Sequence, residues 1–351
     1  MQSKKEVKVD ADTDVSKALK KAISPKNQPL IMIKNISKSY RKKLVLKDLD
    51  FEVFPGDIFG VVGMSGSGKT TLFQLMSGMI TIQAGDVLVR RDALAPPPRS
   101  AQPDYVSVFR NHSLIKKNFG FASQFPSFYE HLTAEENLLM YAALYGLSKK
   151  KAKENTNRLL KLVNLESERD TVAAELSGGM QRRLDIACSL VHDPKVLFLD
   201  EPTSDLDPVM RKQVWALIQE IQSKGTTIVL ASHILEEVEN LCTKVAILQD
   251  KKIVGYGTLK ELKSIFKRPK QIRIELEQGK YEPIIKKLRK ETAIAKIIKK
   301  DNMLVIFARP DDRLTRKIIK AVESNKDKLV SFEVADASLT EIFETVTKKL
   351  K

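Results

Sequence analysis

The stretch GMSGSGKTT, Gly63 to Thr71, places three glycines and two serines directly before a lysine and a threonine. It follows IFGVVG, a continuous apolar run typical of a strand buried on both faces, and it precedes TLFQLMSGMI, whose apolar spacing is helical. A glycine-rich loop between a strand and a helix can turn its backbone N–H groups inward around an anion, beside the positive end of the helix dipole. The stretch therefore predicts a loop that wraps a phosphate chain.

The same loop fits the pattern G-x-x-x-x-G-K-[ST], which binds nucleotide phosphates. In this pattern the lysine, Lys69, reaches the outer phosphates, and the hydroxyl of Thr70 is placed on Mg²⁺. The predicted nucleotide contacts in the loop are Gly63, Met64, Ser65, Gly66, Ser67, Gly68, Lys69, Thr70 and Thr71.

A second apolar segment, VLFLDEP, ends in the two carboxylates of Asp200 and Glu201. A strand-end aspartate can enter the coordination shell of Mg²⁺, and a neighbouring glutamate can polarise an attacking water. Acidic residues are also common at solvated strand ends, so the segment by itself leaves both interpretations open. Beside the predicted phosphate loop, it makes Thr70 and Asp200 candidate metal ligands and Glu201 the candidate catalytic base.

The segment LSGGMQRR, Leu176 to Arg183, opens a helical pattern, QRRLDIACSLV. Its serine and glycines expose N–H groups at a helix N-terminus, which is a second surface suited to phosphate. Together with the phosphate loop and VLFLDEP, the segment resembles the ATP-binding-cassette (ABC) family, whose signature is LSGGQ. In that family two cassettes stack head to tail, and each signature caps the ATP bound by the other. The resemblance implies that Ser177, Gly178 and Gly179 contact the nucleotide of a partner cassette.

The resemblance extends over residues 30–260, with the motifs of the family in order. It implies that Tyr40 stacks on adenine and that Asp207, in SDLDP, belongs to the loop that signals between cassettes. It also implies that Gln124 senses Mg²⁺ and water and couples to a membrane partner. His233 resembles the histidine of the family that contacts the γ-phosphate and steadies the catalytic glutamate.

The resemblance implies an active ATPase that hydrolyses ATP to ADP and phosphate, with ATP and Mg²⁺ bound. ATP binding closes the pair of cassettes in this family, and hydrolysis opens it. The implied catalytic residues are Lys69, Gln124, Glu201 and His233, and the implied metal ligands are Thr70, Gln124 and Asp200.

The chain is long enough for two domains. Residues 1–28 are charged without a sustained period and are expected to be a basic mobile tail. Strands and helices alternate over 29–264, which predicts an α/β P-loop NTPase cassette of the ABC type with a helical subdomain at about 125–190. Four prolines and no clear period predict an inserted loop at 91–118. The order β-α-β-β-α-β over 265–351 predicts a small ferredoxin-like α+β domain.

The net charge of +16 at pH 7 is confined to the two ends of the chain. The first 50 residues carry 13 basic and 6 acidic side chains, and residues 265–351 carry 22 and 13, so the middle is neutral. A basic surface suits anionic lipid headgroups, nucleic acid or solubility alone. No stretch approaches the ~20 apolar residues of a membrane-spanning helix, the N-terminus lacks the apolar segment of a secretion signal, and two cysteines give no disulfide framework. These features predict a cytoplasmic protein.

The resemblance implies the ATPase subunit of an ABC transporter of the drug-, lipid- or polysaccharide-exporter class. Such a subunit pairs with a second cassette, either a copy of itself or a sister, and lies on the inner face of the cell membrane against integral membrane subunits. The alternatives are a soluble cassette ATPase that acts on ribosomes or nucleic acid and a membrane regulator without transport. Nucleic acid is disfavoured, because the chain has neither tandem cassettes nor a long coiled coil, and no aromatic-basic stacking motif.

Overall fold

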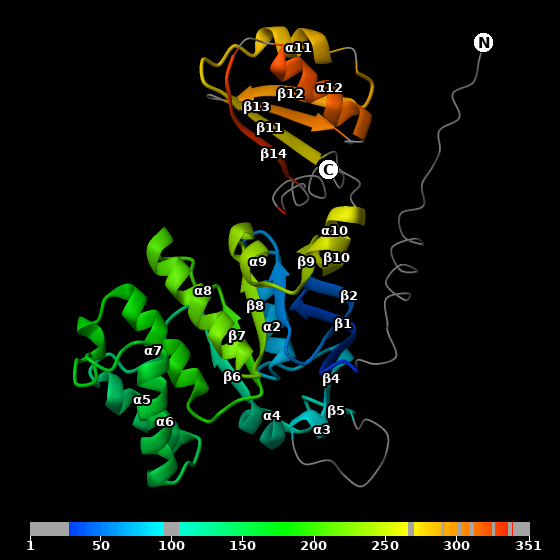
Figure 1. Cartoon of the computed structure of the whole chain (residues 1–351). Helices are drawn as coiled ribbons and strands as arrows, with labels where there is room; N and C mark the ends of the chain where they lie inside the picture. The colour runs from blue at the N-terminus through cyan, green and yellow to red at the C-terminus, as the bar shows by residue number, and fades with distance from the viewer. Residues whose placement is uncertain are drawn as a thin grey trace. The chain divides into compact units, whose positions relative to one another are not determined.

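The chain divides into two compact units, Met1–Tyr256 and Gly257–Lys351, which are described separately (Figure 1). This division falls eight residues before the sequence-based boundary at 264 and assigns α10 (Leu259–Ile265) to the second unit. The expected tail lies outside the described residues apart from Gln28. The computed structural model describes residues 28–94, 105–265, 270–289, 291–300, 303–308, 312–324, 327–335 and 339.

A six-stranded sheet forms the centre of the first unit, in the order β10-β9-β3-β8-β7-β6. The pairs β3–β8, β3–β9, β7–β8 and β6–β7 are all parallel. Every residue of β3, β7 and β8 is buried, as their continuous apolar runs predict for strands covered on both faces. The strands are β3 (Ile58–Val62), β6 (Phe119–Ala122), β7 (Val196–Asp200), β8 (Thr227–Ser232), β9 (Lys244–Gln249) and β10 (Lys252–Thr258).

A second, antiparallel sheet of the first unit has the order β2-β1-β4-β5. Its side chains share one apolar core with the parallel sheet and with α2 (Lys69–Met76). Phe51 of β2 stacks on Phe59 of β3 with ring centroids 5.3 Å apart, and Phe73 of α2 meets Phe198 of β7 edge to face. The strands are β1 (Ile31–Tyr40), β2 (Lys43–Val53), β4 (Ala84–Arg90) and β5 (Tyr105–Ser107).

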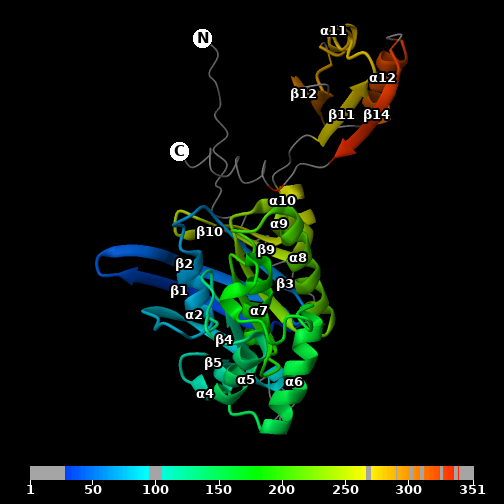
Figure 2. The same ribbon diagram turned by 90° about the vertical axis from the view of Figure 1, so that its left-hand side faces the viewer.

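Three helices form a lobe beside the parallel sheet, in the region where the sequence predicts a helical subdomain (Figures 1 and 2). They are α5 (Ala134–Leu144), α6 (Lys149–Leu162) and α7 (Gly178–Leu190). Helix α5 begins with a capping box, in which the Thr133 hydroxyl accepts from the Glu136 N–H and the Glu136 carboxylate accepts from the Thr133 N–H. Two further helices, α8 (Pro208–Ser223) and α9 (Leu235–Leu241), connect the later strands.

The expectation of an inserted loop at 91–118 is wrong for most of its described residues. Residues 91–94 form the short helix α3 (Arg91–Leu94), and 105–118 contain strand β5 and helix α4 (His112–Asn118). Val106, Val108 and Ile115 are buried in the main core. The strand is three residues long, which is too short for a period to show in the sequence. Residues 95–104, with all four prolines, lie outside the described residues.

The second unit follows the order β-α-β-β-α-β and builds a four-stranded antiparallel sheet, β12-β13-β11-β14. Its core, which includes Ile272, Ile306, Leu288 and Ile318, joins the sheet to both helices. The residues after Ala335 lie outside the described part of the chain, apart from the buried Leu339. The elements are β11 (Lys270–Leu276), α11 (Glu282–Leu288), β12 (Ile294–Lys300), β13 (Met303–Ala308), α12 (Asp312–Glu323) and β14 (Leu329–Ala335).

Because each unit has its own core, we predict that a chain ending at Ile265, which keeps β10 whole and lacks the core of the second unit, folds by itself. A chain ending at Gln249 is the matched control. It lacks Tyr256, whose hydroxyl donates to the Glu52 carbonyl at 2.8 Å and whose ring packs on Phe51 and Phe59. Thermal unfolding followed by circular dichroism should be cooperative for the first and weakened for the second. A non-cooperative transition for the chain ending at Ile265 would refute the independence of the first unit.

Candidate functional site

The glycine-rich loop joins the carboxyl end of β3 to the first residue of α2, as its sequence predicts. Gly66 and Gly68 have φ angles of 76° and 105°, in the left-handed region that side chains disfavour. At Gly63 a Cβ would lie 2.6 Å from the carbonyl oxygen of Leu248, so no larger residue fits there. The three glycines are therefore required by the path of the backbone.

Lys69 begins α2 and turns its side chain back under the loop. Its Nζ donates to the carbonyl oxygens of Gly63 at 2.9 Å and Met64 at 3.3 Å, and it forms an ion pair with Glu201 Oε1 at 3.2 Å. The Lys69 side chain is only 7% exposed. A nearly buried ammonium beneath a loop of backbone N–H groups is a strong point of attraction for a phosphate.

The carboxylate of Glu201 is held at both of its oxygens. Oε1 faces Lys69, and Oε2 accepts from the His233 backbone N–H at 3.2 Å and lies 2.7 Å from its Nδ1. Glu201 follows β7 directly and has a φ of 49°, a strained conformation for a residue with a side chain. Its N–H donates to the Ala231 carbonyl of the neighbouring strand at 2.9 Å, which helps to hold this turn. In this backbone conformation the Glu201 carboxylate lines the cavity beside the loop.

Asp200 is the last residue of β7 and is almost fully buried. Burial raises the pKa of its carboxyl, and the Glu201 charge raises it further, while the Thr70 hydroxyl, Lys69 and Arg182 oppose the rise. Among the described residues its Oδ1 has no hydrogen-bond partner. A divalent cation between this oxygen and the Thr70 hydroxyl would satisfy the carboxylate, so the donor set fits Mg²⁺.

Half of the predicted site residues line a cavity of about 380 Å³. It lies at the carboxyl ends of the parallel strands, the edge at which open α/β sheets bind ligands. Val45 of β2 also lines it and had no signal in the sequence. The predicted residues that line it are Ser65, Gly66, Gly68, Lys69, Thr70, Thr71, Gln124, Glu201 and His233.

Other predicted nucleotide contacts do not line this cavity in the single chain. Tyr40 ends β1 with 46% of its surface exposed, and Lys38 Nζ lies 5.3 Å from its ring centroid. Ser177 caps α7 and is exposed with Gly178, whereas Gly179 is buried so closely against Met210 that a Cβ would lie 2.8 Å from its Sδ.

Asp207, also predicted to lie near nucleotide, caps α8. Its Oδ1 accepts from the N–H groups of Val209 at 2.8 Å and Met210 at 3.0 Å. The signature helix α7 and the cap of α8 therefore meet at Met210, away from the cavity of their own chain.

The sequence reasoning missed Arg182, which is buried on α7 three positions before Asp185. Its guanidinium donates to the carbonyl oxygens of Ser123 at 2.6 Å, Pro202 at 2.8 Å and Asp200 at 3.1 Å. The Ser123 carbonyl immediately precedes Gln124, and the Asp200 and Pro202 carbonyls lie on either side of Glu201. The Arg182 side chain therefore holds the segments of Gln124 and Glu201 against α7. The available signal was an arginine and an aspartate at i and i+3 on the apolar face of a helix.

Asp185 completes this buried cluster. One of its oxygens lies 3.2 Å from Arg182 Nη1, and the other accepts from the N–H and hydroxyl of Ser127 at 2.9 and 2.8 Å. Burial raises the pKa of Asp185 and lowers that of Arg182, while each charge opposes the shift of the other. Loss of either partner would leave the other charged and buried, which is strongly unfavourable.

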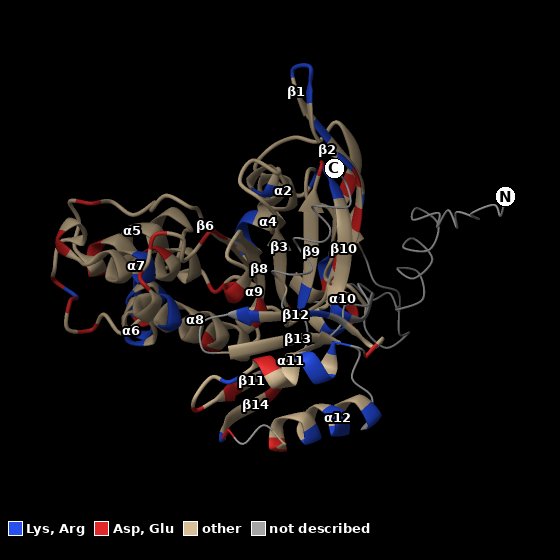
Figure 3. Cartoon of the chain, turned by 90° about the horizontal axis from the view of Figure 1, so that it is seen from above, with Lys and Arg blue, Asp and Glu red and all other residues tan. Residues whose placement is uncertain are grey.

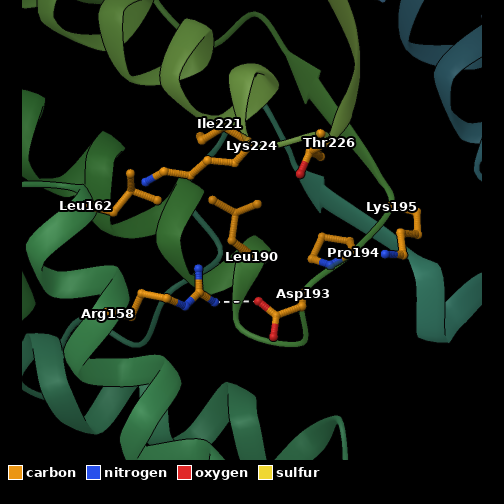
Figure 4. A pocket seen from close by; sticks show the side chains of 10 residues that line it. Arg158, Leu162, Leu190, Asp193, Pro194, Lys195, Ile221, Lys224 and Thr226 are labelled. Atoms are coloured by element: carbon orange, nitrogen blue, oxygen red, sulfur yellow. Dashed lines mark hydrogen bonds and ion pairs between the residues drawn. The ribbon is translucent and has the colours of Figure 1, made fainter. Parts of the chain in front are cut away.

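A second, smaller cavity of about 180 Å³ lies at the opposite edge of the sheet (Figure 4). Lys195 and Thr226, which line it, stand immediately before β7 and β8, at the amino ends of the strands. Arg158 faces Asp193 across it in an ion pair, as Figure 4 shows. None of the predicted site residues lines this cavity, and it has no glycine-rich loop, so we place the functional site at the carboxyl edge.

We predict that Arg182→Ala lowers the free energy of unfolding of the first unit by about 3–5 kcal/mol, because it leaves Asp185 unpaired and several buried carbonyls without a donor. Arg183→Ala is the matched control, since this neighbour donates only to the carbonyls of Val163 and Asn164. Urea unfolding of both variants measures the difference. Equal losses for the two variants would contradict the importance of the cluster.

Comparisons with known proteins agree with this geometry. A family model described as ABC transporter matches residues 46–204. The Nod factor export ATP-binding protein I of Rhizobium sp. (strain N33) is 35% identical over 228 residues, which cover 65% of this chain and 70% of that protein. The protein of the same name from Rhizobium etli is 35% identical over 223 residues, 64% of this chain and 66% of that one. The chain spans about two thirds of the length of these relatives.

Solved structures support the fold. One described as the ATP-binding subunit of an ABC transporter has a TM-score of 0.58 at 27% identity and covers 68% of this chain and 93% of that chain. The structure of cbiO1 from Clostridium perfringens, described as part of the ABC transporter complex cbiONQ, has a TM-score of 0.58 at 24% identity and covers 75% and 95%, which shows the fold alone. With the phosphate loop, the strand-end carboxylates and the signature helix in place, this chain belongs to the ATP-binding ATPases of the ABC transporter family.

Proposed function

We propose that this chain is the ATP-hydrolysing subunit of an ABC exporter, which moves its substrate through separate membrane-spanning subunits. The main support for ATP hydrolysis is the position of the Glu201 carboxylate, which contacts Lys69 through one oxygen and His233 through the other, beside the phosphate loop. The names of the relatives, which are export ATP-binding proteins, favour export as the direction.

Each of the site residues has a separate role in hydrolysis. Backbone N–H groups of the loop and the ammonium of Lys69 bind the phosphates and offset the charge that develops as the terminal phosphoryl group leaves. Glu201 orients an attacking water and accepts its proton. His233 fixes the Glu201 carboxylate through the 2.7 Å contact from Nδ1, and its exposed side chain lines the cavity in which the phosphates would bind.

We assign Mg²⁺ to Thr70, Gln124 and Asp200, of which Thr70 and Gln124 line the cavity. The bound ion supplies Lewis-acid neutralisation of the phosphate oxygens. Thr70 offers its hydroxyl, and Asp200 offers the Oδ1 that lacks a hydrogen-bond partner among the described residues. Gln124 follows Ser123, whose carbonyl is bound to Arg182, so its backbone is held at the rim.

We further propose that two cassettes pair head to tail. Ser177 and Gly178 expose the N-terminus of α7 and do not line the cavity of their own chain, so their phosphate-facing surface is available to a partner. A second copy of this chain is the simplest partner, because each copy carries one phosphate loop and one signature. Each hydrolysis site would then be completed by the other chain.

Exposed apolar side chains lie beside the site, and a membrane partner would cover them. Phe125, next to Gln124, is 78% exposed, and Tyr129 is 47% exposed. Among the described residues no helix is both long and apolar enough to span a bilayer, so the spanning segments would come from another chain. We place the protein on the inner face of the cell membrane.

We also assign the second unit to the ferredoxin-like class, on its element order and antiparallel sheet. Lysines and arginines mark α11 and α12 of this unit (Figure 3). Exposed bases here, such as Lys286, Arg316 and Lys320, suit anionic lipid headgroups at about 1 kcal/mol per charge near the surface.

The tagged full chain, extracted from its native membranes in mild detergent, is predicted to carry a multi-span membrane protein in stoichiometric amount. This complex should hydrolyse ATP in the presence of Mg²⁺. Glu201→Gln should keep the partner and the nucleotide but lose roughly 100-fold or more in hydrolysis, because the general base is removed. Ribosomal proteins or nucleic acid that detach at high salt, in place of a membrane protein, would contradict the exporter assignment.

A further inference from the structure

A buried carboxylate outside the phosphate cavity has no part in the hydrolysis described above. Glu237 lies in α9, four residues after His233, and is fully buried. Its Oε1 accepts from the Thr203 hydroxyl at 2.6 Å and from the Trp215 indole Nε1 at 3.1 Å. A buried carboxylate is costly unless it is hydrogen-bonded, so these contacts are strongly specified.

The contacts of Glu237 join α9, which begins two residues after His233, to the turn after Glu201 and to α8. Thr203 lies two residues after Glu201, in a turn closed by hydrogen bonds from Ser204 N to the Glu201 carbonyl and from Leu206 N to the Thr203 carbonyl. Ser232 immediately precedes His233 and is fully buried. Burial raises the pKa of Glu237, and the hydroxyls of Ser232 and Thr203 and the Trp215 indole oppose this rise.

We propose that Glu237 is a positioning residue for hydrolysis, which holds the turn after Glu201 against the segment that carries His233. Through Trp215 it also joins both segments to α8, the helix that Asp207 caps. This arrangement fixes the Glu201 carboxylate in the geometry in which Oε2 lies 2.7 Å from His233 Nδ1. The inference rests on the proposed role of Glu201 in hydrolysis.

Kinetics separate a positioning role from a merely structural one. Glu237→Ala removes the acceptor, so the turn after Glu201 can shift, and a small misplacement of a catalytic group lowers kcat roughly 10- to 100-fold. The contacts of Glu237 do not include the phosphate loop, so the affinity for a fluorescent ATP analogue should stay unchanged within error. Glu237→Gln keeps an acceptor oxygen for Thr203 and Trp215 and should retain most of kcat.

Glu236 supplies the matched control. It is the preceding residue on the same helix and is exposed, so Glu236→Ala removes a carboxylate without touching Thr203 or Trp215. This variant should keep the wild-type kcat and KM for ATP.

Trp215 provides an independent spectroscopic readout, because it is the only tryptophan in the chain. Glu237→Ala should shift its emission to the red, since the indole N–H loses its partner and water can enter. Thr203→Val, which keeps the shape of the side chain, should lower kcat and leave the emission unchanged. If Glu237→Ala does not fold, the kcat of Thr203→Val alone tests the positioning role of Glu237.

The kinetic measurements use the detergent-extracted complex of the full chain, and the emission is recorded on the purified full chain alone, in which Trp215 is the only tryptophan. A fall in kcat at unchanged nucleotide affinity in Glu237→Ala and Thr203→Val, with rescue in Glu237→Gln, supports the inference. Unchanged kcat in the folded variants would overturn it, as would a parallel loss of nucleotide affinity and of cooperative unfolding. A wild-type complex that binds the analogue but hydrolyses no ATP would overturn the proposed function and the inference together, whereas an active wild type with unaffected variants overturns the inference alone.

Discussion

The first unit depends on one constraint, which is that backbone N–H groups must be aimed at a phosphate chain at the carboxyl edge of a parallel sheet. The loop begins at the end of the fully buried strand β3, and helix α2 begins directly after the loop. The glycines follow from the same constraint, since Gly66 and Gly68 adopt positive φ angles and Gly63 passes too close to the Leu248 carbonyl for a side chain. The apolar core on both sides of the sheet keeps this edge rigid.

Buried polar side chains then relate the separate segments of the site to one another. Arg182 joins the segment of Gln124 to the end of β7, and Glu237 joins the turn after Glu201 to the segment of His233. Such groups contribute little net stability compared with apolar residues, but they tolerate few alternative arrangements. Their value lies in geometry, because the Glu201 carboxylate must be held by Lys69 on one side and by His233 on the other.

The sequence predicted those features that local patterns encode. The strand–loop–helix order around the glycine-rich stretch and the strands buried on both faces each depend on neighbouring residues, and the structure confirms these elements. Arg182 and Glu237 were missed because their partners Ser123 and Thr203 are 59 and 34 positions away in the sequence. A long-range hydrogen bond between a buried charge and a backbone or hydroxyl group leaves no periodic signal.

Other differences between the sequence-based predictions and the structure also have physical causes. Strand β5 was expected to be loop, because a three-residue edge strand carries too few positions to show a period. The roles of all the site residues toward nucleotide stay predictions, and Tyr40, Ser177, Gly178, Gly179 and Asp207 do not line the cavity of their own chain. For the signature residues, the proposed pairing with a second cassette would explain why a single chain does not bring the site together.

Mixing two inactive variants of the full chain tests this completion by a partner most directly. Lys69→Ala removes the phosphate ligand but keeps the signature, whereas Ser177→Arg blocks the signature but keeps the phosphate loop. In a head-to-tail pair of the two variants, one hydrolysis site is intact. Each variant alone should be inactive, and the mixture should recover ATP hydrolysis. A mixture as inactive as its components, or full activity of Ser177→Arg alone, would contradict a site shared between two copies of this chain.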